Sequence, residues 1–329
     1  MKKISGLNYI RAISAVLVIL YHYTTRYTQS YHNVTLENTG LWWGYRAVAV
    51  FFVLSGFLTA HNLKATDTVK TFAKKRAIRL YPAYWVSIIL TTVVTYLFLR
   101  ERFIGIPSTI FNFTMLQEFV GIPSVDGAYW TLMHELWFYL ITGALIFINK
   151  FIKSEKPFEL FSILWIFAIV CFEFIITKVQ FPGFVVTIGN IVLLTKYAST
   201  FIIGISLSYI VKNSKNYLSY LNLILAFLLF FVKFGLDYTL MVVLIAFLVY
   251  IFAKKEITFK HDKIFMFIAG ISYPLYLVHQ MIGYAIIWNL EKLTGRLTAT
   301  VTAFTVSIIL AYLINKFIEK PVLKKFKKS

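Results

Sequence analysis

Long apolar runs recur along the whole chain and are separated by short breaks of charged residues, glycine or proline. A helix needs roughly 20 predominantly apolar residues to cross the hydrocarbon core of a bilayer, so the pattern predicts about ten membrane-spanning helices. The fold class is therefore expected to be all-α, in a polytopic integral membrane protein. Because no linker of useful size separates the runs, residues 1–329 are expected to form a single membrane domain. The predicted spans cover residues 6–25, 45–63, 81–99, 129–149, 158–177, 184–211, 217–234, 236–253, 264–289 and 297–318.

The composition supports this interpretation and excludes two other classes of protein. Charged residues make up 14% of the chain and hydrophobic residues 59%, whereas about a quarter of an ordinary soluble domain is charged. A mean hydropathy of +0.73 excludes a disordered chain. The net charge of +19 comes from 33 Lys and Arg residues that punctuate the apolar runs. This arrangement is typical of membrane topology, so we expect the lipid bilayer as a partner and no nucleic acid.

The distribution of basic residues predicts the orientation of the chain. With alternating spans, 24 of the 33 Lys and Arg residues lie on the side that holds both termini and 9 on the other side. By the positive-inside rule both termini are cytoplasmic, in a multi-pass membrane protein. The start MKK followed by apolar residues resembles a signal peptide, but Arg11 interrupts the apolar stretch and no small-residue cleavage site precedes Tyr21. We therefore expect a retained first span.

Arg11 and His22 are ionisable residues inside the first predicted span, where such groups are costly and are functional candidates. They are eleven residues apart, which places them on one helix face and about 16 Å apart along the axis. A histidine can accept a hydroxyl proton or act as a nucleophile, whereas an arginine stays charged and stabilises anions. A snorkelling arginine and an interfacial histidine explain the spacing equally well.

A cluster of basic residues lies in the segment KKRAIRLYPAYW, just before the third span. It contains Lys74, Lys75, Arg76 and Arg79. Arg76 and Arg79 are three residues apart and would share a helix face, and guanidinium groups match phosphate oxygens well. A cytosolic phosphorylated donor is therefore a candidate ligand. The competing interpretation is a topology signal that binds anionic lipid headgroups.

The segment AYWTLMHELWFY carries His134 and Glu135 into the fourth span. A carboxylate just inside a span is costly unless it is paired, and Arg11, Arg46 or a histidine is a possible partner. Glu135 is the better functional candidate of the two, because a carboxylate can orient or charge a catalytic histidine. A structural ion pair that locks two helices together is an equally good explanation.

Two further segments contain polar residues that are better explained by helix packing than by catalysis. FFVLSGFLTAH contains Ser55 and Gly56, small residues that allow close helix packing, and it lacks the strand-to-helix turn that supports a nucleophilic serine. SYPLYLVHQ places His279 in an apolar setting after Pro274, and a buried, hydrogen-bonded histidine is the commoner explanation there. We expect no metal, because the chain has one cysteine and no H-E-x-x-H or Walker motif.

Taken together and in order, these segments resemble acyltransferase family 3, a family of membrane acyltransferases, over nearly the whole chain. The resemblance is carried by Arg11 and His22 with ten residues between them, FFVLSGF at 51–57, KKRAIRLYPAYW at 74–85, WTLMHELWFY at 130–139, ISYPLYLVH at 271–279 and EKP at 319–321. It implies a multi-pass protein of the bacterial cytoplasmic membrane, with helices that enclose a cavity open to the cytoplasm. It also implies acetyl-CoA or another acyl-CoA as donor, and a hydroxyl of a cell-surface glycan at the outer face as acceptor.

The resemblance also assigns roles to individual residues. His22 becomes the central catalytic residue, Arg11 its essential partner on the same helix, and Glu135 an important acidic position. His22 would either deprotonate the sugar hydroxyl for direct attack or carry the acyl group itself, and the sequence does not separate these routes.

The same resemblance makes Arg76 and Arg79 donor contacts. Lys74 and Lys75 lie beside them and are expected to assist in binding the donor phosphates.

The chain departs from the family pattern in one respect, and two other functions of the protein stay open. Many members of the family carry an extracellular hydrolase-like domain, and this chain ends soon after Lys328. We therefore expect that it either acts alone or hands the acyl group to a separate extracytoplasmic transferase. A transporter or flippase of a polyprenyl-linked or polysaccharide intermediate would also place charged residues along a path, although we see no inverted repeat. A sensory or uptake domain is a third, weaker hypothesis, since fold does not settle function.

Overall fold

The computed structural model describes residues 6–32, 41–64, 66–154, 157–255, 257 and 262–328, and none of them forms a β-strand. The prediction of an all-α, polytopic membrane protein is confirmed. The elements are α1 (Gly6–Tyr21), the π-helix η1 (His22–Arg26), α2 (Tyr27–His32), η3 (Trp42–Ala47), α3 (Val48–Asn62), α4 (Val69–Phe98), η4 (Arg100–Arg102), α5 (Ile106–Asn112), η5 (Gln117–Val120), η6 (Gly127–Tyr129), α6 (Trp130–Ile152), α7 (Pro157–Lys178), α8 (Gly183–Leu193), α9 (Ala198–Lys212), α10 (Tyr217–Lys254), α11 (Lys263–Val278), α12 (Gln280–Thr294), α13 (Arg296–Ile314), the π-helix η7 (Asn315–Glu319) and α14 (Lys320–Lys328).

The helices long and apolar enough to cross a membrane number seven within the described part of the chain. In addition, α11 and α12 pass the same test as a pair, although they are bent by 71° relative to each other. The predicted first span is not among these segments, so the expected count of ten stays a prediction. The seven segments are Trp43–Asn62, Val69–Phe98, Gly127–Ile152, Pro157–Lys178, Gly183–Lys212, Tyr217–Lys254 and Arg296–Phe326.

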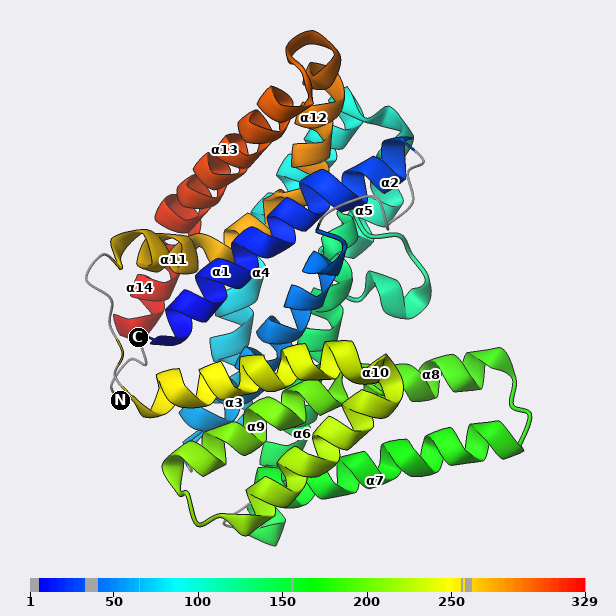
Figure 1. The fold of residues 1–329 in the computed structure, drawn as a ribbon, viewed down its shortest axis with the longest axis vertical. Helices are drawn as coiled ribbons and strands as arrows, with labels where there is room; N and C mark the ends of the chain where they lie inside the picture. The colour runs from blue at the N-terminus through cyan, green and yellow to red at the C-terminus, as the bar shows by residue number, and fades with distance from the viewer. Residues whose placement is uncertain are drawn as a thin grey trace. The chain divides into compact units, whose positions relative to one another are not determined.

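A single glycine divides the longest helix, α10. Gly235 has a φ of 78° and a ψ of 178°, which is not helical. This backbone conformation strongly favours glycine, because a side chain would meet its own backbone there. Figure 1 shows the chain changing direction within α10, between its yellow-green and yellow parts. The break falls between the predicted spans 217–234 and 236–253.

The chain forms two compact units, each assembled from three separated segments. Unit 1 contains residues 1–10, 48–73 and 134–258, and unit 2 contains the rest of the chain. Unit 1 therefore holds α3 and α7 to α10, whereas unit 2 holds most of α1 and α4 together with α11 to α14 (Figure 1). The expectation of one membrane domain stays a prediction.

In unit 1, α9 packs against α3 along a contact made by two glycines. A Cβ atom on Gly56 would lie 2.2 Å from the carbonyl oxygen of Phe201, and one on Gly204 would lie 2.0 Å from that of Val53. Both positions therefore need a residue without a side chain. The predicted role of Gly56 in close helix packing is confirmed.

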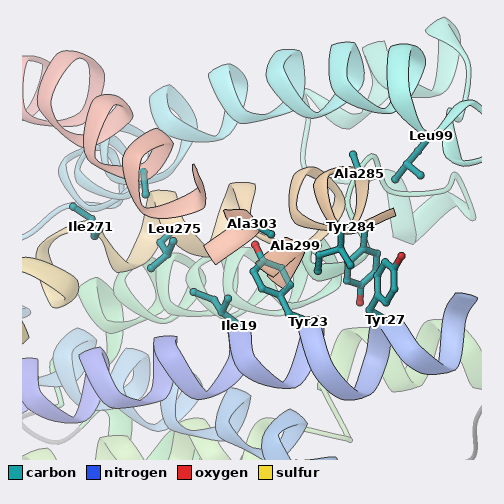
Figure 2. Packing of buried hydrophobic residues seen from close by; sticks show 12 residues of the cluster. Ile19, Tyr23, Tyr27, Leu99, Ile271, Leu275, Tyr284, Ala285, Ala299 and Ala303 are labelled. Carbon is teal, nitrogen blue, oxygen red and sulfur yellow. The ribbon is translucent and has the colours of Figure 1, made fainter. Parts of the chain in front are cut away.

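The core of unit 2 forms around tyrosines from the first helical stretch. Tyr23 and Tyr27 are fully buried and pack against Tyr284 of α12 and the alanines of α13 (Figure 2). Gly283 allows this packing, because a Cβ atom there would lie 2.3 Å from the ring of Tyr23. The Tyr23 hydroxyl donates a hydrogen bond to the carbonyl oxygen of His279 (2.7 Å). This core therefore holds the first helical stretch against the junction between α11 and α12.

Candidate active site

Two histidines from distant parts of the sequence meet in unit 2. His22 begins the π-helix η1, and His279 lies at the junction of α11 and α12. The Nδ1 atom of His22 lies 3.1 Å from the Nε2 atom of His279, and the two rings are nearly perpendicular, with centroids 4.7 Å apart. The structure therefore joins the residue expected to be catalytic to one that the sequence predicted to be buried and hydrogen-bonded.

The hydrogen-bond partners of the two rings fix their tautomers when both are neutral. The Nδ1 atom of His279 lies 2.8 Å from the carbonyl oxygen of Tyr276, which can only accept, so this nitrogen carries the proton. The Nε2 atom of His279 is then an acceptor. The Nδ1 atom of His22 faces this acceptor and the carbonyl oxygen of Val18 (2.9 Å), so it must carry its own proton. A basic lone pair therefore remains on Nε2 of His22.

The π-helical turn that begins at His22 is a feature that the sequence analysis did not predict. Single π-helical turns inside α-helices are rare and are frequent at functional sites. The threonine hydroxyl of Thr24 donates to the carbonyl oxygen of Leu20 (2.6 Å), a local bond that competes with regular helix geometry. His22 thus sits where the regular α-helical pattern ends.

The junction that carries His279 is fixed by hydrogen bonds from three directions. Its carbonyl oxygen accepts from the hydroxyl of Tyr23 and from the backbone N–H of Gly283 (2.9 Å). The hydroxyl of Tyr276 lies 2.7 Å from that of Thr131 and donates to the carbonyl oxygen of Ala128 (2.8 Å). The bend between α11 and α12 is therefore held in place, and so is the imidazole of His279.

A buried carboxylate ties the same junction to the start of α6. Asp126 accepts hydrogen bonds from the backbone N–H groups of Ala128 (2.8 Å) and Met281 (2.9 Å). Burial raises the pKa of Asp126 to about 7, and the two N–H groups oppose that rise. The sequence analysis missed this residue. Its place just before a helical run, where aspartate often caps a helix, was the signal that could have found it.

Arg11 lies on α1 in the same unit, on the same helical stretch as His22. Residues 11 to 21 are α-helical, so the predicted separation of about 16 Å along the axis holds. Arg11 is therefore too far along the helix to contact His22 directly, and its predicted role as partner of His22 stays a prediction.

Glu135 belongs to unit 1, where it accepts hydrogen bonds from two hydroxyls. Ser55 of α3 donates to it at 3.0 Å, and Tyr139 of α6 donates to the same oxygen. Hydrogen bonds to an ionised carboxylate are strong, so these two donors help to offset the cost of placing it inside a span. Ser55 thus acts as a hydrogen-bond donor. A link between Glu135 and His22 stays a prediction.

The predicted donor-binding residues all lie on α4, which begins at Val69, before the span predicted from residue 81. Arg76 and Arg79 are therefore three residues apart on one helix, as expected. Arg79 forms a salt bridge with Glu319 of η7, a glutamate that is 2% exposed and also accepts from Asn315 (2.7 Å). Lys74 lies over the ring of Phe326 on α14. The helix that carries KKRAIRLYPAYW thus packs against the C-terminal part of the chain, a relationship that the sequence did not indicate.

Lys75 and His134 are the remaining residues that the sequence analysis singled out. Lys75 also lies on α4. His134 packs its ring against those of Tyr197 and Phe52 (centroids 5.1 and 6.1 Å apart). Within the described ranges, no three His, Cys, Asp or Glu side chains lie close enough to hold a metal ion.

The sequence model of one protein family, described as an acyltransferase domain, matches residues 4–316. The chain belongs to acyltransferase family 3. Its match includes Arg11, His22, Glu135 and His279, together with the basic segment of α4. Together with the apolar helices, membership of this family makes the protein a multi-pass membrane protein.

Three proteins with curated names show what the chain is similar to. It is 30% identical over 118 residues to nodulation protein 10 of Rhizobium leguminosarum bv. viciae, and 30% identical over 101 residues to the acyltransferase MdmB of Streptomyces mycarofaciens. It is 26% identical over 175 residues to the peptidoglycan O-acetyltransferase OatA of Listeria monocytogenes. These stretches cover 30%, 29% and 47% of this chain and 32%, 26% and 26% of the respective relatives. No solved structure matches the chain.

Proposed function

We propose that the protein is an O-acyltransferase that moves an acyl group, acetyl in the simplest case, from cytosolic acyl-CoA to a hydroxyl of a cell-surface carbohydrate. Membership of acyltransferase family 3 supports acyl transfer, and one relative is named a peptidoglycan O-acetyltransferase. The observation that carries the proposal is the hydrogen bond between His22 and His279, because it leaves Nε2 of His22 as a base.

In the direct route, Nε2 of His22 takes the proton of the acceptor hydroxyl as the oxygen attacks the thioester carbonyl. The tetrahedral intermediate then collapses, the carbon–sulfur bond breaks, and the proton passes from His22 to the leaving CoA thiolate. In the covalent route, Nε2 itself attacks the thioester carbonyl, the carbon–sulfur bond breaks, and CoA leaves as its thiolate. The acceptor hydroxyl then attacks the acyl-histidine, the carbon–nitrogen bond breaks, and the hydroxyl proton passes to the CoA thiolate. Both routes need the same lone pair on His22.

His279 serves as a positioning residue in either route. When His22 gains a proton it becomes an imidazolium, and its Nδ1–H donates to the neutral Nε2 of His279. A hydrogen bond to a charged donor is stronger than one between neutral groups, so the charged form of His22 is stabilised during the reaction. The orientation of the ring is fixed by the same bond, much as a carboxylate fixes the histidine of a serine protease.

The donor is proposed to dock its phosphates on Arg76 and Arg79, with Lys74 and Lys75 beside them. Guanidinium groups bind phosphate oxygens in a fixed, planar geometry. The side chain of Arg79 is 39% exposed although it pairs with Glu319, so part of its guanidinium remains accessible to a ligand. Arg11 and Glu135 are proposed to tune the charge of His22 or of the transition state.

The first experiment follows the thiol released from acetyl-CoA by the purified protein in detergent or liposomes. His22→Ala should lower the turnover number by at least about 100-fold, the usual contribution of a general base. Arg76→Ala should weaken activity mainly at low donor concentration. His61→Ala, a histidine of α3 with no assigned role, serves as the matched control and should keep its activity.

Full activity of His22→Ala would overturn the proposed chemistry. Thiol release that is absent in the wild type, even with membranes supplied as acceptor, would instead favour a transporter or an enzyme that needs a separate extracytoplasmic partner. A transporter would be recognised by substrate flux across liposomes without CoA consumption.

A further inference from the structure

Unit 1 contains a cavity of about 610 Å³ to which the proposed reaction assigns no role. It lies where the ends of α3, α6 and α9 meet the start of α7, and the short connection between α3 and α4 also lines it. All of its lining residues belong to unit 1. The residues proposed for donor docking belong to unit 2, so this cavity is built from a different set of side chains.

Three lysines from three different elements line the cavity. Lys64 follows α3, Lys150 lies in the last turn of α6, and Lys212 lies in the last turn of α9. The only acidic residue among the described lining residues is Asp67. The described part of the lining therefore carries a net positive charge, which favours an anionic ligand.

A structural explanation accounts for only part of this charge. Lysines near helix C-termini interact favourably with the helix dipole, and Lys150 and Lys212 both occupy such positions. Lys212 also donates a hydrogen bond to the carbonyl oxygen of Ala60 (3.1 Å). An ammonium group has three donors, however, so this bond leaves Lys212 able to bind a ligand. Lys64 lies outside any helix, so the helix dipole does not account for its position.

The size and the other walls of the cavity narrow the class of ligand. Its volume lies within the range of about 300–1,000 Å³ that is typical of sites for organic molecules, and is far larger than a simple inorganic ion needs. Leu145 and Phe158 supply apolar wall, and Tyr209 supplies an aromatic ring with a hydroxyl. Ammonium groups beside an apolar surface suit an organic phosphate, whose phosphate contacts the lysines and whose carbon skeleton contacts the apolar wall.

We propose that this cavity binds a phosphate ester through Lys64, Lys150 and Lys212. Two sources offer this chemistry, a soluble nucleotide such as CoA and the headgroup of an anionic phospholipid. The distribution of basic residues predicts that this end of unit 1 faces the cytoplasm, where both are available. The inference goes beyond the proposed function, because it holds whether or not His22 transfers an acyl group.

The test uses the purified full-length chain and a triple variant, Lys64→Gln, Lys150→Gln and Lys212→Gln. A matched control replaces three exposed lysines of the same unit that do not line the cavity, Lys70→Gln, Lys215→Gln and Lys255→Gln. Both variants lose three positive charges. All compared proteins also carry Arg76→Ala, so that CoA held at the proposed donor site does not mask binding in the cavity. Affinities for CoA, for adenosine 3′,5′-bisphosphate and for phosphate-free pantetheine are measured in detergent by calorimetry. Retained lipid is measured by native mass spectrometry after incubation with vesicles of phosphatidylglycerol and phosphatidylcholine.

If the ligand is a soluble phosphate ester, CoA and the bisphosphate should bind and pantetheine should not. The triple variant should then bind CoA roughly 100-fold more weakly, because a unit charge close to a phosphate in water contributes about fivefold to affinity. If the ligand is instead a lipid headgroup, the wild type should retain phosphatidylglycerol and the triple variant should lose it. The affinity of the triple variant for CoA should then be unchanged. The charge-matched control should behave like the wild type in both cases.

Two further variants separate loss of the site from loss of the fold. Lys150→Gln alone removes one charge without disturbing the bond from Lys212 to Ala60 and should weaken binding about fivefold. Leu145→Trp keeps every charge and fills part of the cavity, so it should also weaken binding. Unchanged CoA affinity together with unchanged lipid retention in the triple variant overturns the proposal, as does a wild type that binds neither ligand. A wild type that binds CoA in this cavity but releases no thiol from acetyl-CoA would count against the proposed function alone.

Discussion

The Nε2 atom of His279 accepts a hydrogen bond from His22, a residue 257 positions earlier in the chain. This bond is possible because the helical pair α11 and α12 bends at His279 and because Tyr23 holds the carbonyl group of the bend. His279 donates its other ring N–H to Tyr276 and so cannot donate to His22. The direction of the hydrogen bond follows, and with it the free lone pair on His22.

His279→Ala should lower the turnover number about 10- to 100-fold and leave the KM for the donor unchanged. The reason is that a hydrogen bond to a charged group contributes about 1.5–3 kcal/mol, and here that bond forms fully only when His22 is protonated. His279→Gln keeps a carbonyl oxygen as acceptor and should recover most of the loss. Steady-state kinetics of thiol release measures both parameters. Equal losses in the Ala and Gln variants would argue that His279 serves packing alone.

Arg79 should contribute to stability as well as to donor binding. Removing Arg79 leaves the buried carboxylate of Glu319 without its guanidinium, at a cost of about 1–3 kcal/mol. Arg79→Ala should therefore lower the unfolding temperature in detergent as well as raise the donor KM.

Glu319→Gln provides the matched test of this interpretation. In its presence, Arg79→Ala should cost less stability than in the wild-type background, because the two residues are coupled. Additive effects of the two substitutions would show that the salt bridge does not stabilise the fold.

The sequence predicts the local features of this protein better than its long-range pairings. Apolar runs predict helices, and the break at Gly235 and the close packing at Gly56 follow from residue types within one segment. The contact of His22 with His279, in contrast, joins two helices whose periodicity carries no information about their partner. The same is true of the salt bridge between Arg79 and Glu319.

The prediction that His279 is buried and hydrogen-bonded is confirmed, but it did not identify the hydrogen-bond partners. His279 lies in an apolar segment after a proline, where most histidines are packed and hydrogen-bonded, and it is indeed fully buried. What the sequence did not reveal is that one of its hydrogen-bond partners is the predicted catalytic residue. Asp126 was missed for a related reason, since its second partner, Met281, comes from a distant helix.

Gly204→Ala should destabilise unit 1 by about 1–3 kcal/mol, the usual cost of inserting a methyl group into a filled contact. Its new Cβ atom would lie 2.0 Å from a backbone oxygen of α3, which a side-chain movement does not relieve. Gly270→Ala on α11 is the matched control, because no atom lies within 4 Å of its Cβ position, and it should be neutral or stabilising by up to about 1 kcal/mol. Unfolding temperatures in one detergent measure both. Equal effects would refute the close packing of α3 and α9.

The stability of the protein should fall as the pH rises through neutrality, and Asp126 should be a cause. Its pKa is about 7 in the folded protein against an ordinary value of 3.8, so the folded state binds the proton more tightly than the unfolded state. This contribution to the free energy of unfolding is fully present below about pH 4 and is lost as the pH rises through about 7.

Asp126→Asn removes the titrating group and should flatten the fall in unfolding temperature between about pH 5 and pH 8. At the acidic end the variant should be less stable than the wild type by about 1–3 kcal/mol, because an amide has one oxygen for two buried N–H groups. The two curves should therefore converge as the pH rises. Glu101→Gln, which replaces an exposed carboxylate, should leave the wild-type slope intact. Parallel curves for Asp126→Asn and the wild type would show that the buried carboxyl does not titrate in this range.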